Sequence, residues 1–238
     1  MRREEEYQLS TITNIDTKLL DMINRYIKNA EAQWVIVVAC GSGEFLEALS
    51  DSNPTIQLVG IDDDEKVIAT ARERLKGRKV MLWNEDFTKL SLPKAKADVV
   101  IALNLVQNYP NSLRTIRLLG GFTEGYLILS APNLDNKDYA RWILNEVAEL
   151  STQEELNREK VVTEIGGYCE IWTMDYFRDM VEGAGMRIVE VMTAIEGRIN
   201  VIVARHKSKG DGGEGKWESM WRIRNRDPGR FFDYFRTW

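Results

Sequence analysis

Two glycines and two aspartates stand where they could build a site for a nucleoside. Gly41 and Gly43 follow an apolar, β-branched run at 34–39 and precede a helical pattern. Glycine lets the backbone approach a ligand closely, and the following helix N-terminus can bind an anion. Asp62 ends a second apolar run, where a carboxylate can accept hydrogen bonds from both hydroxyls of a ribose. Asp86 follows a third run, so a second carboxylate is expected beside the first.

The elements that carry these residues alternate along the chain. Strands are expected from short, buried apolar runs at 34–39, 56–61, 80–83, 97–103 and 125–131, followed by a hairpin of 187–192 and 199–205. Helices are expected from three- and four-residue apolar spacing at 16–33, 44–50, 64–76, 113–119, 137–157 and 175–182. This alternation predicts an α/β fold with a doubly wound, mostly parallel seven-stranded sheet and a C-terminal antiparallel strand.

Composition excludes several kinds of site and protein. The 238 residues carry a formal net charge of -5, which argues against a nucleic-acid partner. The single histidine, His206, argues against a metal site and a histidine-based catalytic triad. Two cysteines, Cys40 and Cys169, are too few for a disulfide framework. Since no apolar run approaches the roughly 20 residues that span a bilayer, we expect a cytoplasmic protein without a membrane partner.

Four parts are expected along the chain. Residues 1–33 form an N-terminal segment and helix packing on the core, and 34–207 form the α/β domain. Residues 208–215 are a glycine-rich linker, and 216–238 are an aromatic, basic tail. So many aromatic side chains need a surface to bury against, which the tail's own domain, a second copy or a protein partner could offer. Single-stranded nucleic acid is a further alternative, opposed by the acidic balance of the remaining chain.

From about residue 30 to 206, the order of these segments resembles the class I S-adenosylmethionine-dependent methyltransferases. Val35-Ile-Val-Val-Ala-Cys-Gly-Ser-Gly43 is similar to the first family motif, and Leu58-Val-Gly-Ile-Asp62 is similar to the second. Gly125-Tyr-Leu-Ile-Leu-Ser-Ala-Pro-Asn133 resembles the fifth-strand block. The resemblance implies a Rossmann-like methyltransferase fold that binds S-adenosylmethionine.

The resemblance implies cofactor-binding residues at the ends of the first four strands: Ala39, Gly41, Gly43, Asp62, Asp63, Asp86, Phe87 and Asn104. Asp62 would bind the ribose hydroxyls and Asp86 the adenine amino group. The backbone at Phe87 would meet the adenine ring, and Asp63 holds a position that packs on it.

The remaining four residues would face the methionine part of the cofactor. Ala39, Gly41 and Gly43 would pass close to it, and Asn104 would lie by its ammonium group. Three positions depart from the family pattern, and one of them is Asp63, which stands where the family often has an apolar residue. Val37 stands where the family usually has an acidic residue, and Ala39 stands where it usually has glycine.

No catalytic residue is assigned from the sequence. The loop after the fourth strand reads Gln107-Asn-Tyr-Pro110 and offers no strong base. Tyr109 is expected to be an exposed loop aromatic, with an acid, base or substrate-platform role as the alternative. Residues 133–173 are expected to cover the acceptor site.

Three functions remain open. The first is methyl transfer from S-adenosylmethionine to an unidentified small molecule or protein. The second is a non-catalytic, degenerate cofactor-binding domain that acts through a partner of its tail, suggested by Val37 and Ala39. The third is a nicotinamide-dependent oxidoreductase, since two glycines followed by Asp62 also fit that class. Leu46 at the third glycine position and the expected hairpin argue against it.

Overall fold

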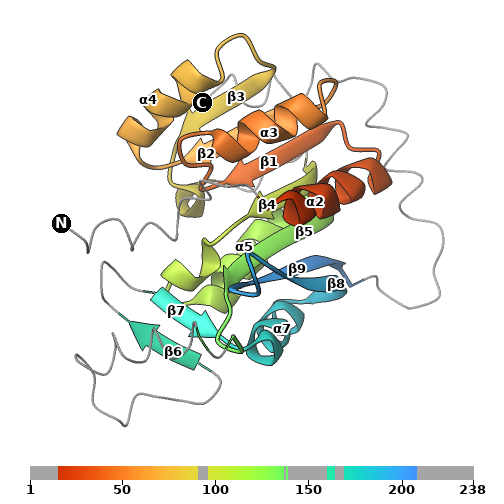
Figure 1. Ribbon diagram of the computed structural model, residues 1–238, viewed down its shortest axis with the longest axis vertical. Helices are drawn as coiled ribbons and strands as arrows, with labels where there is room; N and C mark the ends of the chain where they lie inside the picture. The colour runs from red at the N-terminus through yellow and green to blue at the C-terminus, as the bar shows by residue number, and fades with distance from the viewer. Residues whose placement is uncertain (1–15, 91–95, 137, 139–159, 164–168, 208–238) are drawn as a thin grey trace. The chain divides into compact units, whose positions relative to one another are not determined.

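The computed structural model describes residues 16–90, 96–136, 138, 160–163 and 169–207 (Figure 1). The described α-helices are α2 (Thr17–Asn29), α3 (Glu44–Ser52), α4 (Glu65–Arg74), α5 (Ser112–Gly121) and α7 (Met174–Gly183). Two short 3-10 helices follow β3 and β4: η2 (Phe87–Lys89) and η3 (Val106–Asn108). The helix expected at 137–157, the glycine-rich linker and the aromatic tail lie outside the described residues.

Seven strands form the main sheet: β1 (Trp34–Val38), β2 (Gln57–Asp62), β3 (Val80–Asn84), β4 (Ala97–Ala102), β5 (Thr123–Pro132), β8 (Met186–Ala194) and β9 (Ile199–His206). Their order is β3-β2-β1-β4-β5-β9-β8. The first five pair in parallel, whereas β9 is antiparallel to both β5 and β8. The predicted doubly wound, mostly parallel seven-stranded sheet is confirmed, with the antiparallel strand inserted between β5 and β8.

Apolar periodicity determines which faces are buried. All five residues of β1 and all six of β4 are buried, as expected for central strands covered on both sides. Helix α2 buries one stripe made of Leu19, Met22, Ile23, Tyr26 and Ile27. Asp16 caps its N-terminus, because the Asp16 carboxylate accepts hydrogen bonds from the amides of Lys18 and Leu19.

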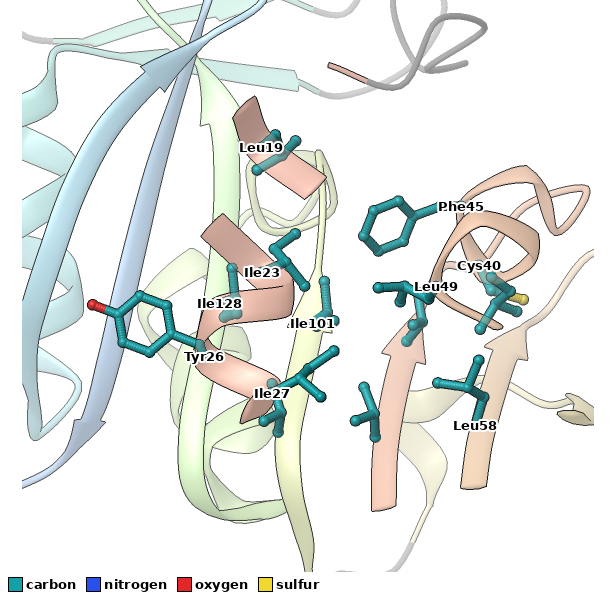
Figure 2. Packing of buried hydrophobic residues seen from close by; sticks show 14 of the residues in the cluster. Leu19, Ile23, Tyr26, Ile27, Cys40, Phe45, Leu49, Leu58, Ile101 and Ile128 are labelled. Carbon is teal, nitrogen blue, oxygen red and sulfur yellow. The ribbon is translucent and has the colours of Figure 1, made fainter. Parts of the chain in front are cut away.

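One large hydrophobic cluster joins helices α2, α3 and α4 to a face of the sheet. Figure 2 shows Ile23 and Ile27 of α2 pointing toward Ile101 of β4, and Leu49 of α3 close to Leu58 of β2. The alternate strand residues, such as Val100 and Leu127, are also buried but lie outside this cluster. Because side chains alternate across a strand, they face the opposite layer, where α5 contacts β4, β5 and α7.

A small second sheet was not expected from the sequence. It pairs β6 (Lys160–Thr163) antiparallel to β7 (Cys169–Trp172). Strand β7 packs against η3 and the end of β5, and Asn133 bridges to Trp172. This hairpin therefore adds buried residues beside the carboxyl edge of the main sheet. Among the described helices, none is long and apolar enough to cross a membrane.

Candidate functional site

The candidate site lies where the strand order reverses. Strand β1 pairs with β2 on one side and β4 on the other, with Val38 opposite Ile61 and Val37 opposite Ile101. In a parallel sheet, ligands bind beyond the carboxyl ends of the strands at such a switch point. The residues after β1, β2 and β4 therefore meet at one edge, as the sequence predicted.

The turn after β1 leaves its backbone uncovered. Ala39 is exposed although its neighbours Val38 and Cys40 are buried. Its φ of 55° lies in the left-handed region, which disfavours alanine and explains why a glycine suits this position. Gly41 has a φ of 57°, and a Cβ built on it meets no atom within 4 Å. The position that a side chain would take at Gly41 is therefore unoccupied, and Ala39 beside it is exposed.

Gly43 has a different structural reason to be glycine. It caps α3 with a φ of 84°, and a Cβ there would lie 3.0 Å from Leu75 and 3.2 Å from Ala71 of α4. The close approach of two helices therefore requires it, and its predicted contact with a cofactor stays a prediction. Two amides of the turn are also already engaged, since Gly41 donates to Asp62 and Gly43 donates to the Cys40 carbonyl.

Asp62 at the end of β2 is held by the glycine turn. One carboxylate oxygen accepts from the Gly41 amide at 2.9 Å, and the other accepts from the Asp64 amide at 3.1 Å. A carboxylate offers about four acceptor positions, so each oxygen of this half-buried group keeps capacity for one more donor. Two free positions on one rigid carboxylate suit a pair of vicinal hydroxyls.

The end of β3 brings a second carboxylate to the same edge. Asn84 lies opposite Asp62 in the register, and Asp86 follows two residues later. Asp86 accepts from the Thr88 hydroxyl at 2.6 Å and the Thr88 amide at 2.9 Å, and it pairs with Lys89 at 3.1 Å. These interactions, the Thr88 hydroxyl first, lower the pKa of Asp86, so the group is ionised at neutral pH.

Tyr109 lies against this part of the site. Its ring meets buried Phe87 edge-on, with ring centroids 5.5 Å apart. Burial raises the pKa of Tyr109, and three nearby carboxylates raise it further. They belong to Asp63, Asp86 and Asp62. The expectation of an exposed loop aromatic was wrong, because this loop folds back onto η2 and half-buries the tyrosine.

Asn104 is fixed beyond the end of β4. Its amide donates to the Ser130 hydroxyl at 2.9 Å and to the Ser130 carbonyl at 3.1 Å, and its side-chain oxygen accepts from the same hydroxyl. A φ of 50° is one that asparagine tolerates better than most residues. Ser130 was not predicted from the sequence, although a serine within the apolar run Leu127–Ala131 of β5 was a visible signal.

Two residues at the end of β1 offer no chemistry. Val37 belongs to the hydrophobic cluster, so it contributes core packing and no charged group to the site. Cys40 is buried, and burial raises the pKa of its thiol to about 12. The interpretation of Cys40 as a small buried hydrophobe agrees with this geometry. Across the described ranges, no group of three or more His, Cys, Asp or Glu side chains could hold a metal ion.

Residues 35–119 match the profile of the family described as "Methyltransferase domain". Among curated proteins, the chain is 31% identical over 127 residues to a trans-aconitate 2-methyltransferase of Afipia carboxidovorans. The match covers 52% of this chain and 48% of that protein, so the chain spans about half of its length. A trans-aconitate 2-methyltransferase of Variovorax paradoxus is 26% identical over 172 residues, which is 66% of each chain.

Solved structures share the fold at low sequence identity. An S-adenosylmethionine-dependent methyltransferase from Clostridium acetobutylicum aligns with a TM-score of 0.61 at 12% identity, over 87% of this chain and 98% of that one. A magnesium protoporphyrin IX methyltransferase from Synechocystis, solved with bound SAH, aligns with a TM-score of 0.59 at 17% identity, over 80% and 83%. The [4+2]-cyclase SpnF aligns with a TM-score of 0.61 at 14% identity, over 79% and 80%.

Proposed function

We propose that this chain, which contains a methyltransferase domain at residues 35–119, transfers the methyl group of S-adenosylmethionine to a small-molecule acceptor. The observation that carries the proposal is the meeting of an open glycine turn with two ionisable carboxylates at the switch point of the sheet. The names of the two trans-aconitate 2-methyltransferases support a small-molecule acceptor.

The residues of the turn fit such a cofactor. The open space at Gly41 and the exposed backbone at Ala39 would accept the methionine part. Asp62 would accept hydrogen bonds from the two ribose hydroxyls, using the two acceptor positions that its backbone partners leave free. Asp86 and the backbone of Phe87 would meet the adenine, Asp63 would lie beside it, and Asn104 would accept from the ammonium group.

The chain's contribution to the reaction is orientation. When bound, the sulfonium supplies a methyl group whose carbon bonds to the acceptor's lone pair, while the C–S electron pair stays on sulfur and the acceptor's proton leaves to solvent. The backbone turn and Asp62 would hold the cofactor, and so fix the position of its sulfur relative to the acceptor. Holding two reactants in line accounts for much of the acceleration in such a transfer, so the absence of a strong base in the 107–110 loop is compatible with catalysis.

Calorimetric titration with S-adenosylhomocysteine tests the cofactor site. Hydrogen bonds to a charged group contribute ~1.5–3 kcal/mol, so Asp62→Ala should weaken binding roughly 10- to 150-fold. Glu73→Ala is the control, because Glu73 is an exposed carboxylate in the last turn of α4, a helix that begins beyond Asp62 and ends before the start of β3. The melting temperature of each variant shows whether a loss of affinity reflects a lost ligand contact or a destabilised fold. Equal affinity of Asp62→Ala and the wild type would refute this assignment.

A second candidate function is favoured by Val37 and Ala39. A buried valine and a strained alanine would weaken the methionine end of the site, and the chain would then act as a binding domain. The same fold occurs in the [4+2]-cyclase SpnF, so this architecture is found in enzymes that catalyse different reactions. S-adenosylhomocysteine binding with no methyl transfer to any tested acceptor favours this candidate. Saturable binding of NAD in its place would favour the oxidoreductase alternative.

A further inference from the structure

The end of α4 supports the glycine turn that follows β1. Ala71 and Leu75 lie so close to Gly43 that a Cβ added there would stand 3.2 Å and 3.0 Å from their side chains. Beside them, the Nε of Arg74 donates a hydrogen bond to the Ser42 carbonyl at 3.0 Å. The helix after the second strand therefore holds the turn after the first strand by packing and by one charge-assisted hydrogen bond.

The rest of the Arg74 guanidinium group contacts α3. Its Nη2 donates to Glu44 at 3.1 Å and its Nη1 donates to Glu47 at 3.5 Å. A guanidinium group presents its donors in a fixed plane, so one side chain can hold a carbonyl and two carboxylates at the same time. Arg74 therefore fixes the Ser42 carbonyl relative to the first turn of α3.

The Ser42 carbonyl is important because a glycine lies on each side of it. Gly41 and Gly43 have φ values of 57° and 84°, and glycine has the widest choice of backbone conformations. The peptide groups between two glycines rotate easily unless a contact restrains them. A restraint on the Ser42 carbonyl removes that freedom before a ligand binds, which lowers the entropy cost of binding.

The same turn holds the carboxylate proposed to bind the ribose. The Gly41 amide donates to Asp62 at 2.9 Å, and Gly41 directly precedes Ser42. A continuous series of contacts thus runs from Arg74 through the turn to Asp62. Arg74 was not predicted as a site residue, because a basic residue in the last turn of a helix is already explained by the helix dipole.

We propose that Arg74 is a positioning residue for S-adenosylmethionine. It acts through the turn 41–43, which it holds, together with Asp62, in the conformation that binds the cofactor. This inference deepens the proposed function and rests on it for the identity of the ligand. The competing explanation is that Arg74 only neutralises the charges of Glu44 and Glu47 beside the turn.

Arg74→Ala and Arg78→Ala form a matched pair. Among the described residues, Arg78 pairs with Glu47 and Asp51 of α3, so it belongs to the same group of surface ion pairs. The loss of either arginine should lower the melting temperature by a similar, small amount. Calorimetric titration with S-adenosylhomocysteine should show roughly tenfold weaker binding to Arg74→Ala and unchanged binding to Arg78→Ala.

Arg74→Lys separates positioning from charge. Lysine keeps the positive charge but lacks the planar group that holds a carbonyl and two carboxylates together. We therefore expect Arg74→Lys to lose nearly as much affinity as Arg74→Ala.

Hydrogen exchange in the chain without ligand reports on the turn itself. The Gly41 amide is protected by its hydrogen bond to Asp62. Measured by NMR, this amide should exchange several-fold faster in both Arg74 variants and at the wild-type rate in Arg78→Ala.

The outcomes separate this inference from the proposed function. Full affinity in Arg74→Lys, an equal loss of affinity in Arg78→Ala, or an unchanged exchange rate of the Gly41 amide would overturn the inference. If the wild type and Arg74→Ala bind S-adenosylhomocysteine equally well, the cofactor site stands and the role of Arg74 falls. If the wild type does not bind S-adenosylhomocysteine, the proposed function falls and the inference falls with it.

Discussion

The substitution Gly41→Ala tests whether Gly41 faces a ligand or is glycine only because of its backbone conformation. Gly41 and Gly77 both have a positive φ, 57° and 81°, and a Cβ on either meets no atom within 4 Å. Alanine in the left-handed region costs about 1–2 kcal/mol, so Gly41→Ala and Gly77→Ala should lose similar free energies of unfolding. Gly77 lies between α4 and the start of β3, at the opposite edge of the sheet from the candidate site.

Only the Gly41 methyl would enter the space proposed for the cofactor. Overpacking of a fitted interface costs about 1–3 kcal/mol, so Gly41→Ala should weaken S-adenosylhomocysteine binding roughly 5- to 150-fold. Calorimetric titration measures the affinity, and urea unfolding measures the stability of both variants. Unchanged affinity in Gly41→Ala, or an equal loss of affinity in Gly77→Ala, would refute the reasoning that the open space at Gly41 faces the ligand.

Three further predictions concern the elements around the site. Ala39→Gly should raise the free energy of unfolding by about 0.5–1 kcal/mol in a denaturant titration, because relief of the left-handed strain exceeds the added chain entropy. Burial raises the pKa of the Cys40 thiol to about 12, so peptide mass spectrometry should find negligible alkylation of that cysteine at pH 8.5. The buried neutral thiol stabilises the fold fully below its ordinary pKa of 9.0, and this stabilisation is lost as the pH rises from 9.0 to about 12. Asp98→Ala should destabilise the fold by about 2–4 kcal/mol in thermal unfolding, since its buried carboxylate accepts from the amides of Gln33 and Trp34 at 2.9 Å each; a loss below about 0.5 kcal/mol would contradict this.

The sheet was predictable because each central strand corresponds to a short apolar run in the sequence. The apolar runs of β1 and β4 are buried on both faces, and such runs fix central parallel strands whatever surrounds them. Connections between parallel strands are right-handed, so the convergence of Ala39, Asp62 and Asn104 at one edge followed from their positions at strand ends. Assigning roles to those residues required the resemblance to a family.

The surroundings of the residues in the loops beyond the strand ends were not predictable from local pattern. The burial of Glu170 depends on the β6–β7 hairpin packing against η3, a contact between segments about 60 residues apart. From the sequence alone, a glutamate followed by two apolar residues is expected in an edge strand, with its charged group in water. The half-buried position of Tyr109 likewise depends on Phe87, which lies on a different loop. Loop residues acquire their surroundings from tertiary packing rather than from their neighbours in sequence.

Mapping of backbone amides during titration with S-adenosylhomocysteine tests the central claim most directly. In two-dimensional NMR of the deuterated full chain, we expect the perturbed amides to cluster at residues 39–43, 62–63, 86–87 and 104. These four segments are far apart in sequence and meet only at the carboxyl edge of β1 to β4. Perturbations confined to other elements, or saturation without any change at these four segments, would contradict the proposed cofactor site.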